Sequence, residues 1–544
     1  MSENAAAPAR PAWRRHLPDL LGWVVPLAAA WALFATLRAT GWARLRGLRS
    51  VENYGMAVVD QFAWVWAHEG VWRQTVHFGY DDTWTWSGHR PMLWPLVAKA
   101  YAWDPQPFFL VQVQLGLAAL GCLPAYALGR AAIGGVSGGI VGLALLALSP
   151  PFWAIALNDY QDIVLGVPFL LAAWWAMRER RPAWFLLFAA LAAAAREEWA
   201  LMLPLLGLGL PARLRERATW VGWGLLVTAL HALVGALAVE AGGYENPMAT
   251  HMDGMLHGIP PLSRTWADWE RFYQHFFLPT GWIGLLAPLA ALPLVGLFAF
   301  HLTAPSAGGV DTDWLRHIHH MAPATAFLTV AGIEAIAALL RVAYPAGRPR
   351  PVAWWRDVEP MRELGRAPPR APRAVRALLA VGIVALLVGN AAPWLRLLQL
   401  SPTLSSALPA ADAPEWALLA AHVPPDGVIA TDAQASTLVS ARAVAYTYDQ
   451  SLQDKAPGRG LRAVEYLLVQ KRHAEWVARA EAEEGATLLG ETQAYRLYRF
   501  PRTPAQLVPG RVPGARPAGG AGDVAPGGAA GDANLRGRHR LGAP

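Results

Sequence analysis

The sequence predicts a mainly α-helical protein that crosses a membrane about eleven times and carries a small α/β domain near its C-terminus. Of its 544 residues, 54% are hydrophobic and only 16% are charged, whereas about 25% of residues are charged in a typical soluble protein. Long apolar runs alternate with short basic segments along most of the chain. Further on, short strand-like and helix-like segments replace the apolar runs.

Residues 1–16 are polar and basic, and we expect a cytoplasmic tail there. The membrane domain should occupy residues 17–400. Most of its apolar runs are long enough to cross a hydrocarbon core of about 30 Å as helices. They lie at residues 17–37, 107–129, 131–149, 162–177, 219–239, 279–302, 318–340 and 377–395. Prolines within 279–302 favour a broken helix pair in that run.

Two basic segments, residues 178–182 and 213–217, should both lie on the cytoplasmic side, where arginine accumulates. The apolar stretch between them must then cross the membrane and return. Arg196, Glu197 and Glu198 lie at its middle, which predicts two short helices with these charges at the tip. Charges at membrane depth are costly and usually functional. An ion pair that only holds the tip together is the alternative.

The basic inner segments place the N-terminus inside the cell and the C-terminal domain outside. Four arginines oppose this orientation because they follow the first helix on the predicted outer side. They are Arg38, Arg44, Arg46 and Arg49. The inner segments together outweigh them.

A large first outer loop should occupy residues 40–106. It is too polar to cross a bilayer and unusually rich in tryptophan: Trp64, Trp66, Trp72, Trp84, Trp86 and Trp94. Indole rings prefer the headgroup level of a membrane. We therefore expect a platform at the outer surface and predict the active site there.

Asp60 is the first candidate catalytic residue of this loop. Phe62, Val65, Trp66 and Glu69 follow it at helical spacing, which predicts a helix lying on the membrane with Asp60 near its start. A carboxylate is favoured at that end of a helix. The residue is therefore either a helix cap or a general base or metal ligand.

Asp159 and Asp162 lie on the second outer loop, on the same predicted side as Asp60. Carboxylates on separate loops could share a divalent cation or divide the roles of base and metal ligand. A solvated loop without a ligand is the alternative.

His89 and Arg90 follow a tryptophan-rich turn. The paired donors of arginine bind phosphate well. The indole faces of Trp64 and Trp86 could stack on sugar rings, although anchoring at the membrane edge is the commoner role of such residues.

Residues 401–500 differ in composition and predict an extracytoplasmic α/β domain. Its expected strands are GVIAT, AVAYTY, VEYLLVQ, ATLLGET and YRLYRF, and its expected helices are DAQASTLVSA and KRHAEWVARAEAEEG. Residues 501–544 are rich in Gly, Pro, Ala and Arg without periodicity, which predicts a disordered tail.

Several motifs in this order resemble the bacterial membrane proteins of domain-of-unknown-function family 2079. They are Asp60–Gln61 with Trp64, His89 with Pro91, PxPFFLVQVQLGLAALGCLPAYALGR, NDYQD, the triplet Arg196–Glu197–Glu198, and VPPDGVIAT followed by LVSAR. Two positions depart from the family pattern: Gln161 stands in place of a histidine, and Arg196 in place of a lysine.

That family is similar in architecture to the GT-C glycosyltransferases, which transfer sugars from polyprenyl-phosphate carriers on the outer face. The resemblance implies a GT-C-like bundle and makes Asp60 the general base or a metal ligand. As a hypothesis for such a transferase, Asp159 and Glu197 would position the substrate or a cation, and Arg90 or Arg196 would neutralise the departing phosphate.

We therefore expect a multi-pass protein of the cell membrane that moves a sugar from a lipid carrier to an envelope acceptor. Glu198 would contact the substrate or pair with Arg196, and a divalent cation would be the cofactor if one is needed. A transporter or lipid flippase, which also places charges within broken helices, and a non-catalytic envelope scaffold are the alternatives. The net charge of +7 gathers at membrane edges and predicts no nucleic-acid partner.

Overall fold

The computed structural model describes residues 13–47, 53–70, 75–76, 92–157, 160–210, 212–242, 283–294, 322–343, 413–442, 444–448, 452, 460–502 and 507. Several predictions fall outside these ranges. They are the roles of Trp86, His89, Arg90 and Asp159, the run 377–395, and the tail beyond residue 507.

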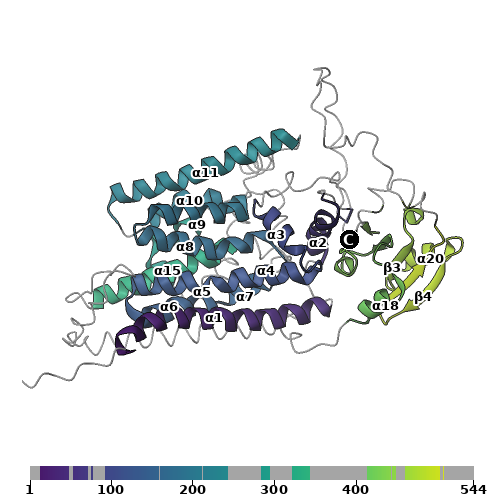
Figure 1. Ribbon diagram of the computed structural model, residues 1–544, viewed down its shortest axis with the longest axis horizontal. Coiled ribbons are helices and arrows are strands. Elements are labelled where there is room, and N and C mark those ends of the chain that lie inside the picture. Colours follow the sequence, from purple (N-terminus) through teal and green to yellow (C-terminus); the bar gives the residue numbers. More distant parts are fainter. Residues whose placement is uncertain are drawn as a thin grey trace, which may run out of the picture.

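The helices run side by side in one bundle, and a small α/β domain lies at one end of it (Figure 1). α1 and α11 form opposite edges of the bundle in this view. The principal helices are α1 Trp13–Arg46, α4 Pro107–Leu120, α5 Cys122–Ala132, α6 Gly135–Ala147, α8 Gly166–Arg178, α9 Pro182–Ala195, α10 Glu197–Gly209, α11 Leu214–Gly242 and α15 Ala322–Ala343.

Four helical segments among the described residues are long and apolar enough to cross a membrane: Val24–Arg46, Pro107–Ala132, Leu214–Leu237 and Ala322–Leu340. The two edge helices expose large apolar side chains, such as Trp31 at 72% and Leu214 at 81%. Exposed apolar surface of this kind is typical of a face that meets lipid. These observations support a polytopic membrane protein, while the number of eleven crossings stays a prediction.

The predicted hairpin between the two basic segments is confirmed. α9 ends at Ala195, α10 begins at Glu197, and Arg196 between them has an extended backbone. The two basic segments meet at the other end, where Arg180 Nε lies 2.9 Å from Glu216 Oε1. The three charges of the triplet therefore lie at the hairpin tip.

Glycines allow α5 and α6 to approach closely. A Cβ atom on Gly129 would lie 2.1 Å from the carbonyl oxygen of Gly138, and one on Gly142 would lie 2.2 Å from that of Ala125. Small residues at such crossings let helix backbones pack directly. The turn between the helices uses Gly134 and Gly135, both with positive φ.

The C-terminal domain contains a five-stranded sheet in the order β2-β1-β3-β5-β4. The strands are β1 Ile429–Thr431, β2 Ala445–Thr447, β3 Tyr466–Gln470, β4 Thr487–Glu491 and β5 Tyr495–Arg499. β1 is parallel to β2 and β3, whereas β5 is antiparallel to β3 and β4. Each strand falls within a predicted segment.

The helices of this domain match the sequence less closely. α20 (Ala474–Ala482) was predicted, and α18 (Pro414–His422) was not. The expected helix DAQASTLVSA is instead a loop with one 3-10 turn, η7 (Ser436–Leu438). Asp432 explains the difference, because its Oδ1 accepts the backbone N–H of Ala435 at 2.8 Å and so offers the backbone an alternative to a helix.

Arg38, Arg44 and Arg46 do not follow the first helix, as the sequence predicts, but lie within α1, which continues to Arg46; Arg49 lies outside the described residues. Arg44 is buried and donates to the carbonyl oxygen of Leu157. The carbonyl oxygen of Arg46 accepts the backbone N–H of Ala413 at 2.8 Å and the indole N–H of Trp416 at 3.1 Å. These contacts join the end of α1 to Leu157 and to α18.

Candidate active site

Asp60 lies in the middle of a buried helix. α2 spans Asn53–Glu69, so the prediction that Asp60 stands near the helix start, and that it caps the helix, is wrong. Phe62 and Val65 have no exposed surface. The apolar face expected to lie on the membrane is therefore packed inside the protein.

Two hydroxyl groups hold the Asp60 carboxylate. The hydroxyl of Tyr101 donates to Oδ1 at 2.7 Å, and the hydroxyl of Ser440 donates to Oδ2 at 2.6 Å. Asp60 has no solvent-exposed surface. Burial disfavours the charged form and raises the pKa of Asp60 to about 7, although the hydrogen bonds from Ser440 and Tyr101 oppose the shift. The carboxyl group is therefore poised to gain or lose a proton near neutral pH.

Gln61, the residue after Asp60, binds the 75–76 segment. Its Oε1 accepts the backbone N–H groups of Thr75 at 2.7 Å and Val76 at 3.1 Å. Its Nε2 donates to the Thr75 hydroxyl at 3.1 Å and lies 3.4 Å from the carbonyl oxygen of Arg442. Gln61 is fully buried, so it anchors both the 75–76 segment and the C-terminal domain.

The 75–76 segment in turn contacts the edge strand β2. The Thr75 hydroxyl donates to the carbonyl oxygen of Ala445 at 2.5 Å and accepts its N–H at 3.0 Å. The Thr447 hydroxyl donates to the carbonyl oxygen of Val76 at 3.1 Å. The Asp60–Gln61 pair therefore lies where the first outer loop meets the C-terminal domain.

A second charged cluster lies at the hairpin tip. Arg196 Nε is 3.0 Å from Glu198 Oε1, and Arg196 Nη1 is 3.4 Å from Asp162 Oδ1. Arg196, Glu197 and Glu198 are all buried. The structure thus brings Asp162 and the triplet together, as an ion-paired network.

The helix α3 (Trp94–Tyr101) separates the two clusters. Leu93, just before it, donates its backbone N–H to the carbonyl oxygen of Ala194 at 2.9 Å, while Tyr101 at its end contacts Asp60. Eight residues of helix rise about 12 Å. The two clusters therefore form separate subsites at opposite ends of α3.

The described carboxylates of Asp60 and Asp162 belong to separate clusters. Both oxygens of Asp60 accept hydroxyl hydrogen bonds, and Oδ1 of Asp162 accepts from Arg196 and from the backbone N–H of Ile163. Over the described ranges, no group of three or more His, Cys, Asp or Glu side chains is arranged to hold a metal.

Two tryptophans of the predicted platform have defined surroundings. Trp64 is half-buried and stacks on His68, with ring centroids 4.0 Å apart. Trp94 is buried and lies 5.9 Å from the ring of Tyr160. Trp94 is therefore a core residue and does not anchor the protein at a membrane surface.

Sequence reasoning did not single out Tyr101 or Ser440. Tyr101 lies 41 residues from Asp60 and Ser440 lies 380 residues away, so no local pattern connects them. The one available signal was the LVSAR motif, which contains Ser440 and Arg442.

Solved structures show a similar architecture. ArnT from Cupriavidus metallidurans bound to undecaprenyl phosphate aligns over 88% of this chain and 98% of its own, with 14% identity and a TM-score of 0.51. This chain shares the fold of ArnT. The apo structure of the same protein aligns over the same shares of both chains, with 13% identity and a TM-score of 0.46.

The shared fold agrees with the predicted architecture of a membrane helix bundle with a small C-terminal domain. No protein-family model matches the sequence, and a search of curated proteins finds no match. The resemblance to domain-of-unknown-function family 2079 therefore stays a prediction.

Proposed function

We propose that this protein is a membrane glycosyltransferase that moves a sugar from a polyprenyl-phosphate carrier to an acceptor in the cell envelope, on the outer face. The observation that carries the proposal is the buried carboxylate of Asp60, held by Tyr101 and Ser440 in a chain with the fold of ArnT. The undecaprenyl phosphate bound to ArnT supports a polyprenyl phosphate as the lipid.

In this proposal Asp60 is the general base of an inverting transfer. It takes the proton of an acceptor hydroxyl while the hydroxyl oxygen attacks the anomeric carbon, and the polyprenyl phosphate leaves. A base works best when its pKa lies near the working pH. Burial supplies this condition by raising the pKa of Asp60 to about 7.

The acceptor must reach Asp60, which is fully covered here. Ser440 and the neighbouring η7 turn cover it from the C-terminal domain. The catalytic cycle therefore includes a movement of this domain away from α2, which admits the acceptor. Closure then excludes water and strengthens electrostatic interactions at the site.

The hairpin tip supplies the second subsite of the proposal. Arg196 would neutralise the departing phosphate. Glu197, Glu198 and Asp162 would hold the guanidinium group of Arg196 in position. The buried network among these residues supports this role, because it orients the guanidinium group. Arg90, His89, Trp86 and Asp159 stay candidates for sugar, phosphate or cation contacts.

The test is transfer from a panel of polyprenyl-phosphate sugars, in proteoliposomes, by wild type and Asp60→Asn. Loss of a general base lowers the rate by about 10²–10⁴-fold, while carrier binding should be retained. Glu69→Gln is the matched control, because Glu69 is an exposed carboxylate at the end of the same helix. Unchanged transfer by folded Asp60→Asn would exclude the role of base.

One observation favours a second candidate, a non-catalytic envelope scaffold. Asp60 and Gln61 both join the first outer loop to the C-terminal domain, which is what purely structural residues would do. In a scaffold, Asp60→Asn would weaken domain docking, and no donor in the panel would be consumed by the wild type. Consumption of a donor by wild type decides for the enzyme.

A further inference from the structure

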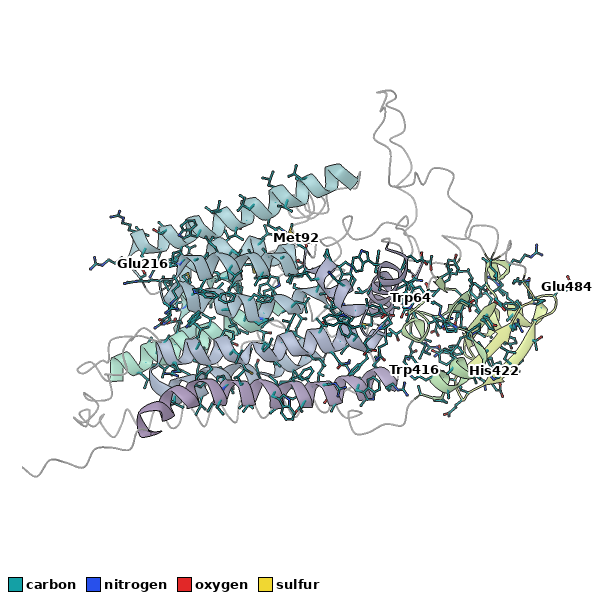
Figure 2. All side chains as sticks on the ribbon, in the orientation of Figure 1. Trp64, Met92, Glu216, Trp416, His422 and Glu484 are labelled. Carbon is teal, nitrogen blue, oxygen red and sulfur yellow. The ribbon has the colours of Figure 1, made fainter. Side chains whose placement is uncertain are left out.

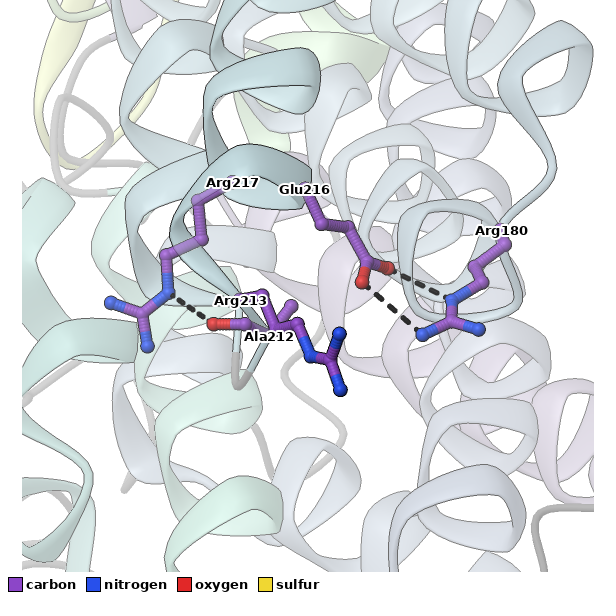
Figure 3. Close-up of a pocket in the computed structure, with 5 residues that line it drawn as sticks. All are labelled: Arg180, Ala212, Arg213, Glu216 and Arg217. Atoms are coloured by element: carbon purple, nitrogen blue, oxygen red, sulfur yellow. Dashed lines mark hydrogen bonds and ion pairs between the residues drawn. The ribbon is translucent and has the colours of Figure 1, made fainter.

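A pocket lies at the end of the helix bundle that carries the two basic segments. Its volume is about 780 Å³, and it is lined by Arg180, Ala212, Arg213, Glu216 and Arg217. Figure 3 shows Arg217 and Arg180 at opposite sides of the pocket in this view, with Arg213 between them. Three arginines against one glutamate leave the pocket strongly positive.

Arg180 occupies a backbone conformation that normally selects glycine. Its φ is +56°, in the left-handed region. Its backbone N–H donates to the carbonyl oxygen of Met177 at 3.1 Å, and that of Arg181 donates to Ala176 at 2.8 Å, so this is the turn that ends α8. A side chain in this left-handed conformation is strained.

The ion pair between Arg180 and Glu216 does not offset this backbone strain. Arg180 Nε and Nη2 contact the two carboxylate oxygens of Glu216 at 2.9 and 3.2 Å, but the Arg180 side chain is 76% exposed. Exposed ion pairs contribute little to stability. The pair instead holds the guanidinium group at the rim of the pocket.

The other two arginines also present hydrogen-bond donors at this pocket. Arg217 is fixed by the hydrogen bond from its Nε to the carbonyl oxygen of Ala212 at 3.0 Å, which leaves its terminal nitrogens as donors. Arg213 makes no ion pair with any residue that the structure describes. The preference of arginine for the cytoplasmic side explains the composition of this edge, but not that three arginines line one pocket.

The surroundings indicate a lipid instead of a free phosphate. Leu214 and Trp184, at the starts of α11 and α9, are 81% and 47% exposed. Leu187 continues this exposed apolar surface along α9. An acyl chain could therefore lie against these helices while its phosphate occupies the pocket.

The pocket is remote from the Asp60 site. Glu216 is labelled at the end of the bundle opposite to Trp416 and His422 of the C-terminal domain (Figure 2). It therefore belongs to the other membrane leaflet when the bundle spans a bilayer.

We infer that this pocket binds the phosphate of an anionic phospholipid in the leaflet opposite to the Asp60 site. Arg213 and Arg217 contact the phosphate oxygens, and Arg180, positioned by Glu216, closes the rim. The bound lipid joins the turn between α8 and α9 to the start of α11. The inference holds whether or not the protein is a transferase.

The test is native mass spectrometry of the full-length protein titrated with phosphatidylglycerol, phosphatidylcholine or inorganic phosphate. Wild type should bind phosphatidylglycerol in preference to phosphatidylcholine. Each arginine near a charged headgroup contributes about fivefold to binding, so Arg213→Gln with Arg217→Gln should weaken phosphatidylglycerol binding about 25-fold. Arg215→Gln is the matched control, because Arg215 is exposed on the same turn but does not line the pocket.

Three results would overturn the inference. Equal weakening by Arg215→Gln would show attraction to the general charge of this edge and no defined site. Equal affinity for phosphatidylcholine would exclude recognition of the anionic headgroup. Inorganic phosphate that displaces phosphatidylglycerol at equal concentration would show a phosphate site without lipid contacts. If the double variant is unstable, the single variant Arg213→Gln gives the same comparison.

Discussion

At the scale of single residues, the Asp60 carboxyl group combines two opposing influences. Burial disfavours its charge, whereas the hydroxyl groups of Tyr101 and Ser440 stabilise the charge, and burial is the larger effect. The result is a group that titrates near neutral pH instead of near 4, where an exposed aspartate titrates. The pH dependence of the apparent Tm and that of the transfer rate should both reflect this titration.

The stability prediction concerns Asp60→Asn between pH 5 and pH 8. The folded protein holds the Asp60 proton up to about pH 7, whereas the unfolded chain releases it near pH 4. Asp60 therefore favours the folded state at low pH, and this contribution is lost as the pH rises. We expect the variant to gain apparent Tm relative to wild type from pH 5 to pH 8. A difference in Tm that is independent of pH would contradict the raised pKa.

The activity prediction concerns Ser440→Ala and Tyr101→Phe. Each substitution removes a hydrogen bond that lowers the pKa of Asp60. Hydrogen bonds to a charged group contribute about 1.5–3 kcal/mol, so the acidic limb of the pH–rate profile should move up by about one to two pH units. Thr437→Ala, on the turn beside Ser440, is the control and should leave the limb unchanged. A lower rate without a shifted limb would indicate a structural role only.

At the scale of secondary-structure elements, the α9–α10 hairpin depends on its buried charges. Arg196 bridges Asp162 and Glu198, so one guanidinium group stabilises carboxylates from two segments. Removing one partner of such a network leaves buried charge behind and costs about 3–5 kcal/mol. The same network is the proposed phosphate subsite, and stability alone does not separate the two roles.

Two variants of the hairpin distinguish the structural role of this network from phosphate binding. Arg196→Leu should lower the apparent Tm strongly, and Arg196→Leu combined with Glu198→Leu should recover much of it, because well-packed apolar residues can replace buried ion pairs. If Arg196 binds the departing phosphate, the recovered double variant stays inactive. Full activity in that stable variant would assign the network a structural role. The exposed pair Arg479–Glu475 is the control, because its loss should change Tm little.

At the scale of the whole molecule, the C-terminal domain is a cover over the candidate base. It contacts the first outer loop through Ser440, Arg442 and β2, and it contacts the end of α1 through Trp416. All these contacts lie at one end of the bundle (Figure 1). If Asp60 is catalytic, turnover requires that the contacts to the loop break and reform.

A reversible lock tests this requirement. The Thr75 hydroxyl exchanges hydrogen bonds with the backbone of Ala445 at 2.5 and 3.0 Å, so the two positions are close and cysteines are placed at both to form a disulfide. The background is Cys122→Ala, because Cys122 is the one cysteine of the chain. We expect oxidation to abolish transfer and a reductant to restore it. The single variant Thr75→Cys should be indifferent to both treatments. Full activity of the oxidised double variant would show that the domain does not need to move.

Periodicity and composition were sufficient for much of the fold. The apolar runs around α1, α4–α6, α8, α11 and α15 follow directly from hydropathy, and the five strands follow from short β-branched and aromatic segments. The helix expected at 432–441 does not form, because the Asp432 side chain accepts a hydrogen bond from the nearby backbone. That competition is too specific for a propensity argument to anticipate.

The sequence by itself determined that this chain enters a membrane, where its charged hairpin tip lies, and that Asp60 and Arg196 are candidates for chemistry. These conclusions rest on local order, since hydropathy and charge act over a few neighbouring residues. Only the tertiary structure decided that Asp60 is buried under the C-terminal domain, that Tyr101 and Ser440 hold it, and that Asp162 meets Arg196. The physical reason is that a pKa and an ion pair depend on which distant segments exclude water together, and packing alone brings those segments into contact.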